Sequence, residues 1–187
     1  ASKWPTASYI RDLVVLGMFS GARIEELCGL TVGCVSFEKG TAYVEIKQDG
    51  EDRSLKTDAA VRVLAFTHKA PVAVLKARTK EKAADALLFD ELSPGGPDNK
   101  LSFAPVKAFT RYRRECGVAD GADFHSFRRT VATVLEREGV DVVKAQRFLG
   151  HAVPTVMHRV YSRGPNREAM AEVAKAIRYG QAVEKQL

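Results

Sequence analysis

One short region of β-forming residues interrupts a chain whose apolar residues otherwise recur at helical spacing. Residues 42–46 follow an alternating pattern rich in β-formers, Asp49 and Gly50 offer turn chemistry, and residues 60–66 form a second β-like run. These residues predict a small antiparallel sheet near the N-terminal part of a mainly α-helical protein of the α+β class.

Helical patterns fill most of the remaining sequence. The expected helices span residues 8–19, 23–30, 71–84, 102–116, 125–138, 142–149, 154–160 and 168–178. Gly117, Gly139 and Gly150 each follow one of these patterns, where glycine is a frequent C-terminal stop. Residues 93–100 have the proline, glycine and asparagine content of a surface loop.

The 187 residues are enough for one substantial core and too few for two ordinary domains. No apolar run approaches the roughly 20 residues needed to span a bilayer, and the first ten residues lack a basic stretch followed by an apolar one. We therefore expect a cytoplasmic protein with no membrane partner. Cys28, Cys34 and Cys116 show no CxxC spacing, so we expect buried thiols and neither a disulfide nor a zinc site.

The net charge of +6 is confined to the second part of the chain. Residues 101–187 contain 15 Lys or Arg against 9 Asp or Glu, an excess of 15 − 9 = 6. Excess cationic charge favours a polyanion, because neutralising phosphates releases their counterions. Nucleic acid is therefore the expected class of partner.

Five residues in four separate stretches have the side chains that metal-free cleavage of a phosphodiester would need. They are Arg23, His125, Arg128, His151 and Tyr161. Such a reaction requires an in-line nucleophile, cationic donors on the non-bridging oxygens and a proton for the leaving group. The sequence shows no carboxylate cluster for two metals and no GxxxxGK[ST] loop, so we expect no metal, no cofactor and no small-molecule substrate.

Two of these stretches have an informative spacing. Glu26 lies three residues after Arg23, a spacing that places both side chains on one face of a helix. His125 and Arg128, at i and i+3, project from one side of a helix and can meet a single phosphate. Taken singly, each of these residues also fits an ordinary surface or core position.

The motifs that contain these residues resemble, in this order, the catalytic domain of the tyrosine recombinases, the phage integrase family. The motifs are GARIEELCGL at 21–30, HSFRRT at 125–130, LGH at 149–151, and Tyr161 ten residues after His151. The resemblance runs from about Tyr9 to about Arg163. It implies the helical catalytic domain of that family, with a small three-stranded antiparallel sheet.

The resemblance also implies a role for each residue. Arg23 and Arg128 would bind the scissile phosphate, with Glu26 supporting the site. His125 and His151 would contact the phosphate or carry the proton of the nucleophile.

Tyr161 would be that nucleophile, and a lysine between the second and third strands would protonate the departing 5′ oxygen. The stretch RSLKTDAAVRVLAF resembles the family's lysine motif and favours Lys56. Lys47 in the preceding strand is the alternative, because Ala60 and Ala65 stand where the family frequently has Ser and Pro, which loosens the alignment.

The implied activity is site-specific DNA recombination or integration, with strand cleavage and rejoining through a 3′-phosphotyrosyl intermediate. The partner would be double-stranded DNA, bound by a homotetramer of the full-length protein. Residues 1–187 would be a catalytic-domain fragment without the N-terminal core-binding domain. Residues 164–187 would form a C-terminal tail helix that packs on its own core or on a neighbouring protomer.

Two other functions stay open. A type IB topoisomerase-like enzyme uses a similar set of residues, although the short length and the LGH motif favour a recombinase. A DNA-binding protein of the same fold without catalysis is expected to lack at least one of Arg23, Arg128 and Tyr161, and the sequence contains all three.

Overall fold

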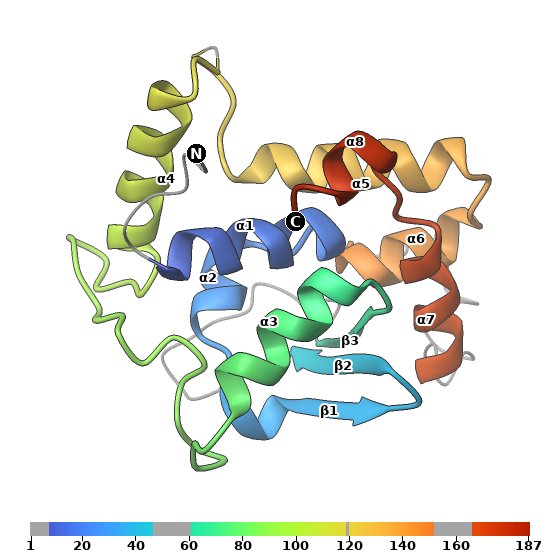
Figure 1. Ribbon diagram of the computed structural model, residues 1–187, viewed down its shortest axis with the longest axis horizontal. Helices are drawn as coiled ribbons and strands as arrows, with labels where there is room; N and C mark the ends of the chain where they lie inside the picture. Colours follow the sequence, from blue (N-terminus) through green and yellow to red (C-terminus); the bar gives the residue numbers. More distant parts are fainter. Residues whose placement is uncertain (1–7, 47–60, 119, 152–165) are drawn as a thin grey trace.

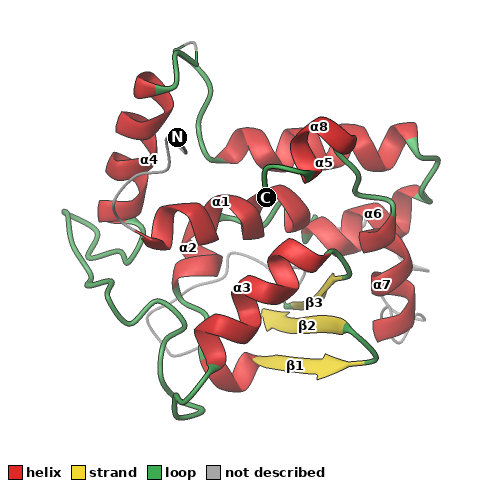
Figure 2. Cartoon of the chain, viewed as in Figure 1, coloured by secondary structure: helices red, strands yellow, loops and turns green. Residues whose placement is uncertain are grey.

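The computed structural model describes residues 8–46, 61–118, 120–151 and 166–187, and shows a mainly helical protein with one small sheet at one side (Figures 1 and 2). The elements in chain order are α1 (Ser8–Ser20), α2 (Ile24–Cys28), the 3₁₀ helix η1 (Val32–Cys34), β1 (Val35–Glu38), β2 (Thr41–Ile46), β3 (Arg62–Phe66), α3 (Lys69–Thr79), α4 (Phe103–Glu115), α5 (His125–Arg137), α6 (Val142–Leu149), α7 (Arg167–Lys175) and α8 (Gln181–Glu184). This order confirms the predicted α+β class and its three-stranded antiparallel sheet.

Helix α1 forms the centre of the protein because it is apolar almost all the way round. Leu13 and Leu16 are fully buried, and Ile10 and Val15 are 1% exposed. A helix of this kind has to be covered on every side. Accordingly, α1 contacts α2, α3, α4, α5 and β3, so elements distant in sequence meet on one central helix (Figure 1).

The sheet has the strand order β1-β2-β3 and is antiparallel throughout (Figure 2). Val44 at its centre pairs with Val35 on one side and with Leu64 on the other. Lys39 and Gly40 join β1 to β2, and both have positive φ (47° and 82°), as in a two-residue type I′ hairpin turn. The sequence indicated β2 and β3 by range but not β1, because a non-glycine residue with positive φ is uncommon and gives no turn signal.

The C-terminal segment packs on the protein's own core. Met170 in α7 is fully buried, and α7 contacts β3 and α6. The Tyr179 hydroxyl donates a hydrogen bond to the Met18 carbonyl near the end of α1. Arg11 on α1 donates to the Leu187 carbonyl at 2.9 Å. Within this single chain the tail is thus packed in cis, which is one of the two arrangements that the sequence left open.

Several boundaries differ from the predicted ones. The helix predicted at 23–30 shortens to the five residues of α2, because it ends before Gly29 and the chain then enters η1. The helix predicted at 71–84 begins at Lys69, with Pro71 in its first turn where a missing N–H is tolerated, and ends at Thr79. The helix predicted at 154–160 lies outside the described residues.

The structure also tests the predictions on cysteines and membranes. Cys28 and Cys34 are buried free thiols, as predicted. The prediction of a buried thiol is wrong for Cys116, which is exposed because it follows the last turn of α4 at the surface. Over the described ranges, no helix is long and apolar enough to cross a bilayer.

Replacing Met170 by Ala tests whether α7 belongs to the core of the single chain. The loss of a fully buried side chain should lower the free energy of unfolding by about 2–5 kcal/mol. Val142→Ala, at a position 67% exposed, is the control and should change it by less than about 0.5 kcal/mol. Urea unfolding followed by circular dichroism gives both values. A Met170→Ala loss as small as that of the control would contradict packing in cis.

Candidate active site

Two arginines meet on the carboxylate of Glu26. This side chain lies in the first turn of α2 and is 4% exposed. It accepts hydrogen bonds from the Arg23 backbone N–H at 2.7 Å and from Arg23 Nη1 at 3.0 Å. Nη1 and Nη2 of Arg62, at the start of β3, donate to its two oxygens at 3.0 and 2.9 Å. Glu26 therefore fixes Arg23 and is itself held by a second arginine.

Arg62 also reaches the C-terminal end of α6. Its side chain is 3% exposed, and its Nε donates to the Phe148 carbonyl at 3.0 Å. Carbonyls in the last turn of a helix lack partners within the helix, and the helix dipole favours a cation there. Arg62 thus joins β3 to both α2 and α6.

A turn at the end of α6 directs His151 toward the arginines. Gly150 has φ +73°, its N–H donates to the Arg147 carbonyl, and the His151 N–H donates to the Gln146 carbonyl at 2.8 Å. This pair of bonds is a Schellman motif, in which glycine adopts the left-handed conformation at low cost. A Cβ on Gly150 would also lie 2.7 Å from Arg62 Nη1, so the close approach of the guanidinium requires glycine as well.

Arg128 in the first turn of α5 completes the cluster and is 4% exposed. Its Nε donates to His151 Nε2 at 3.3 Å, and its Nη1 donates to the Gly21 carbonyl at 3.0 Å. Gly21 has φ +61°, and a Cβ there would lie 2.8 Å from Leu149 Cδ2. Among the described residues, Nη2 of Arg128 has no hydrogen-bond partner although it is buried. A buried donor without a partner is costly, so this nitrogen favours a ligand that brings an acceptor.

The charges in the cluster also favour an anion. Burial first, and then the charges of Arg23 and Arg62, lower the pKa of Arg128 to about 10. Burial and then nearby cations, Arg128 foremost, lower the pKa of His151, which favours a neutral imidazole. Burial by itself would raise the pKa of Glu26, but the hydrogen bonds and charge of Arg62, together with Arg23, outweigh it and lower the pKa.

These groups can bind a tetrahedral oxyanion such as a phosphate diester. In the described part of the cluster, three guanidinium groups lie near one carboxylate, which pairs with Arg23 and Arg62 but not with Arg128, so an anion would relieve their repulsion. The Arg23 side chain is 48% exposed and can reach a ligand from solvent. His125 begins α5, is exposed, and acts electrostatically on His151. Within the described ranges, no group of three His, Cys, Asp or Glu side chains could hold a metal ion.

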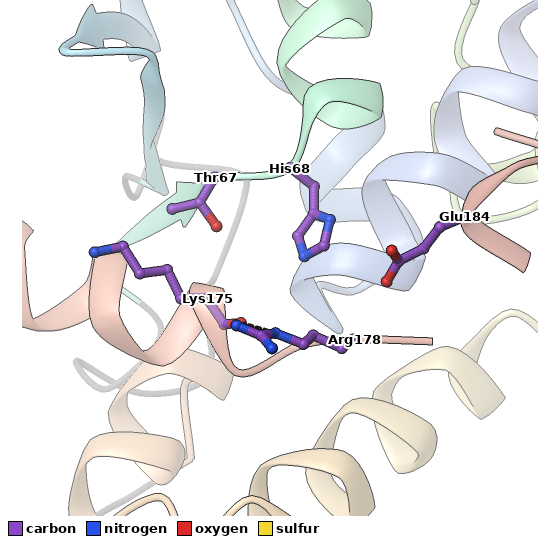
Figure 3. A pocket seen from close by; sticks show the side chains of 5 residues that line it. All are labelled: Thr67, His68, Lys175, Arg178 and Glu184. Atoms are coloured by element: carbon purple, nitrogen blue, oxygen red, sulfur yellow. Dashed lines mark hydrogen bonds between the residues drawn. The ribbon is translucent and has the colours of Figure 1, made fainter. Parts of the chain in front are cut away.

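A separate hollow lies at the other end of β3. Thr67, His68, Lys175, Arg178 and Glu184 line it (Figure 3). Lys175 is paired with Glu172 at 2.6 Å, and Arg178 Nε donates to the Lys175 carbonyl at 3.2 Å. The His68 ring centroid lies 4.6 Å from that of Phe19. Lys175, Arg178 and His68 thus already contact the protein itself, and none of the lining residues belongs to the cluster around Glu26.

Comparison with known proteins decides the family. The family model described as "Phage integrase family" matches residues 2–166. The chain belongs to the phage integrase family. The matched range contains every motif from which the sequence predicted this family.

Curated relatives of this integrase-family chain are named as tyrosine recombinases. The chain is 29% identical over 175 residues to "Tyrosine recombinase XerA" of Pyrococcus furiosus, covering 89% of this chain and 55% of the relative. It is 30% identical over 149 residues to the XerA of Thermococcus kodakarensis, covering 79% of this chain and 49% of the relative. With "Tyrosine recombinase XerC" of Thermodesulfovibrio yellowstonii, it shares 28% identity over 145 residues, covering 76% of this chain and 46% of the relative. The chain spans about half the length of the curated relatives it matches.

Solved structures agree with the integrase assignment at the level of the fold. A crystal structure of XerH site-specific recombinase bound to difH substrate, a pre-cleavage complex, aligns with a TM-score of 0.58 and 18% identity. The alignment covers 98% of this chain and 47% of that one. A post-cleavage complex of XerH with palindromic difH substrate gives a TM-score of 0.55 and 21% identity, covering 81% of this chain and 42% of that one.

The structure gathers part of the predicted site. Four of the predicted catalytic residues lie around the same cluster, namely Arg23, His125, Arg128 and His151. Glu26 contacts Arg23 as predicted, but Arg23 precedes α2 as its extended N-cap residue, so the two do not share a helix face. Lys56, its alternative Lys47, and Tyr161 lie outside the described residues. The catalytic role of every one of these residues stays a prediction.

Arg62 is the site residue that the sequence interpretation missed. It stands at the head of the apolar run RVLAF, in the stretch from which Lys56 was chosen. Charged residues are almost never fully buried unless they are paired. An arginine at the start of a strand whose other residues are core-forming was therefore the available signal, but the sequence could not show its partner, 36 residues away.

Replacing Glu26 by Gln should destabilise the protein, because Arg62 would stay buried without its counter-charge. Breaking a buried ion pair from one side typically costs about 3–5 kcal/mol. The lowered pKa of Glu26 means that its contribution is fully present above the unfolded pKa, about 4.3, and is lost as pH falls through the folded pKa. The difference between variant and wild type should therefore shrink in acid.

Urea unfolding at a series of pH values measures this difference. Glu38→Gln removes a half-exposed carboxylate in β1 and is the control, with an expected change below about 0.5 kcal/mol. A Glu26→Gln loss that stays constant into strong acid would show that the carboxylate charge is not the cause.

Replacing Gly150 by Ala should lower the free energy of unfolding more than the same change at Gly139. Both glycines have left-handed φ (+73° and +67°), so both variants lose about 1–2 kcal/mol from backbone strain. Only at Gly150 does the new Cβ meet a side chain, the Arg62 guanidinium, whereas nothing lies within 4 Å at Gly139. Displacing hydrogen bonds of a charged group adds about 1.5–3 kcal/mol. Equal losses in the two variants by thermal unfolding would contradict this contact.

Proposed function

We propose that this chain is the catalytic part of a site-specific DNA recombinase or integrase that cuts and rejoins strands through a 3′-phosphotyrosyl intermediate. The observation that carries the proposal is the buried Nη2 of Arg128, which has no partner among the described residues and lies in a cluster with Arg23 and His151. Membership of the phage integrase family and the names of the curated relatives support it.

In the proposed reaction, Tyr161 attacks the scissile phosphorus. A bond forms between the phenolic oxygen and phosphorus while the bond from phosphorus to the 5′ oxygen breaks. Lys56, or Lys47 as the alternative, gives the departing 5′ oxygen its proton. A 5′ hydroxyl from another strand then reverses these steps, so the number of phosphodiester bonds is unchanged and no nucleotide needs to be hydrolysed.

The cluster on α2, α5 and α6 would stabilise the negative charge that grows on the non-bridging oxygens. Arg128 and Arg23 would donate hydrogen bonds to these oxygens in the pentacoordinate transition state. His151, whose lowered pKa favours a neutral imidazole, can accept the phenolic proton. His125 would contact the phosphate from the start of α5, and Glu26 would keep Arg23 in place.

Double-stranded DNA is the proposed substrate. Exposed cations on α4 support this proposal, because Lys107, Arg111 and Arg114 follow one another at i, i+4 and i+7 on one face of the helix. Exchange between two duplexes involves four strands, each needing a nucleophile, which supports the proposed homotetramer of the full-length protein on DNA. With DNA as the substrate, we also propose a cytoplasmic location.

A covalent trapping experiment tests the proposal without knowledge of the target site. The 187-residue chain is incubated with a pool of nicked duplexes of randomised sequence, in which cleavage releases a short fragment and prevents rejoining. Adducts that survive denaturation are separated by gel electrophoresis and sequenced. The wild type should form an adduct, Tyr161→Phe should form none, and Tyr9→Phe, which removes a phenol from α1, should behave as the wild type.

Two results would overturn parts of this proposal. An adduct with Tyr161→Phe would place the nucleophile elsewhere. DNA binding by the wild type without any adduct would favour a DNA-binding protein of this fold that lacks catalysis.

Arg23→Ala should still bind DNA and should lower the rate of adduct formation about 10²- to 10³-fold, as removal of one oxyanion donor does in other enzymes.

A further inference from the structure

We propose that Arg62 is a positioning residue for this reaction: from the start of β3 it holds Arg23, through Glu26, and His151, through the end of α6, in one fixed arrangement. The inference rests on the proposed function. It adds a residue that acts through the phosphate-binding groups and does not itself contact the phosphate.

The first half of the argument is the path from Arg62 to Arg23. Both Nη atoms of Arg62 contact the two oxygens of Glu26 at 3.0 and 2.9 Å. The same oxygens accept the backbone N–H and Nη1 of Arg23. The orientation of the Glu26 carboxylate, and with it that of the Arg23 guanidinium, therefore depends on Arg62.

The second half is the path from Arg62 to His151. Nε of Arg62 donates to the Phe148 carbonyl at 3.0 Å, three residues before His151. The intervening Gly150 turns the chain directly against the Arg62 guanidinium. His151 in turn accepts a hydrogen bond from Arg128, so the position of the α6 end sets the distance between the imidazole and the second phosphate-binding arginine.

These two paths close into a ring. Arg128, which contacts His151, also donates to the Gly21 carbonyl, two residues before Arg23. The path through His151 therefore ends beside the path through Arg23. Arg62 is the member of this ring that contributes from the sheet, and at 3% side-chain exposure it has no free face for DNA. All three guanidinium nitrogens are engaged, on acceptors that include Glu26 of α2 and Phe148 of α6. A lysine has a single nitrogen and cannot reproduce that planar fork.

A buried arginine can also be purely structural, and Arg113 provides the matched control. Counted over the whole residue, backbone included, Arg113 and Arg62 are both 7% exposed. Arg113 Nη2 pairs with Asp120 at 2.9 Å, and its Nη1 donates to the Val118 carbonyl at 3.2 Å. It thus has the same kinds of contact as Arg62, a carboxylate and a backbone carbonyl, on α4 and the turn that follows it.

The experiment compares Lys and Met substitutions at Arg62 and Arg113 in the 187-residue chain, at a temperature where unfolding curves show all variants folded. Adduct formation on the randomised nicked duplexes should slow about 100-fold in Arg62→Lys and at least as much in Arg62→Met, as misplacement of reacting groups by about 1 Å does elsewhere. DNA affinity should stay within about threefold of the wild type, since Arg62 makes no DNA contact. Both Arg113 variants should keep the wild-type rate.

Proton NMR of the His151 ring supplies a readout that does not need activity, with His151→Asn used to assign the signal. Arg62→Met should raise the titration midpoint of His151, because a neighbouring cation is removed and the α6 end is released. Arg113→Met should leave the midpoint unchanged.

The outcomes separate the inference from the proposed function. A folded Arg62→Met with the wild-type rate, or Arg113 variants that are slowed equally, would overturn the positioning role. If the wild type forms no adduct, the recombinase proposal fails, and the His151 titration then decides whether Arg62 orders the cluster. An unshifted His151 midpoint in Arg62→Met would then overturn the claim that Arg62 orders the cluster.

Discussion

The Glu26 carboxylate, shared by Arg23 and Arg62, is the contact on which the arrangement of the site depends. It lies at 4% exposure on a helix of only five residues, which has little stability of its own. The helix is held instead by its contacts with α1 and by Arg62 from the sheet. A buried ion pair adds little net stability compared with apolar packing, but it fixes geometry, because each partner is strongly unfavourable without the other. The pair therefore serves to place Arg23 more than to stabilise the fold.

The cluster gathers positive charge in a partly buried place, which by itself opposes folding. Burial first, and then repulsion from the neighbouring cations, lower the pKa values of Arg128 and His151. Two glycines make the crowding possible, since a Cβ at Gly21 or Gly150 would collide with Leu149 or with the Arg62 guanidinium. Repulsion between fixed cations is relieved when an anion binds between them. The same arrangement that is unfavourable in the free protein therefore favours a phosphate in the proposed complex.

Much of this protein could be predicted from its sequence, for local reasons. The pattern of α1 predicts a buried helix because periodicity depends only on neighbouring residues, and α6 matches its predicted range because Asp141 caps its start and Gly150 its end. The i, i+3 spacing of Arg23 with Glu26 is also a local property. By contrast, β1 was missed because its turn begins with Lys39, which gives no turn signal, and Cys116 was placed in the core although α4 ends at the surface.

The sequence by itself determined the class of fold and the phage integrase family, and it indicated the predicted site residues but not Arg62, since motifs and periodicities are properties of short stretches. Only the tertiary structure decided which distant groups meet. Arg62 donates to Glu26 across 36 residues and to Phe148 across 86, and Arg128 donates to Gly21 across 107. Such partners are chosen by the packing of α2, α5 and α6 around α1 and β3. Packing depends on the shape of the whole core, which no single stretch of sequence contains.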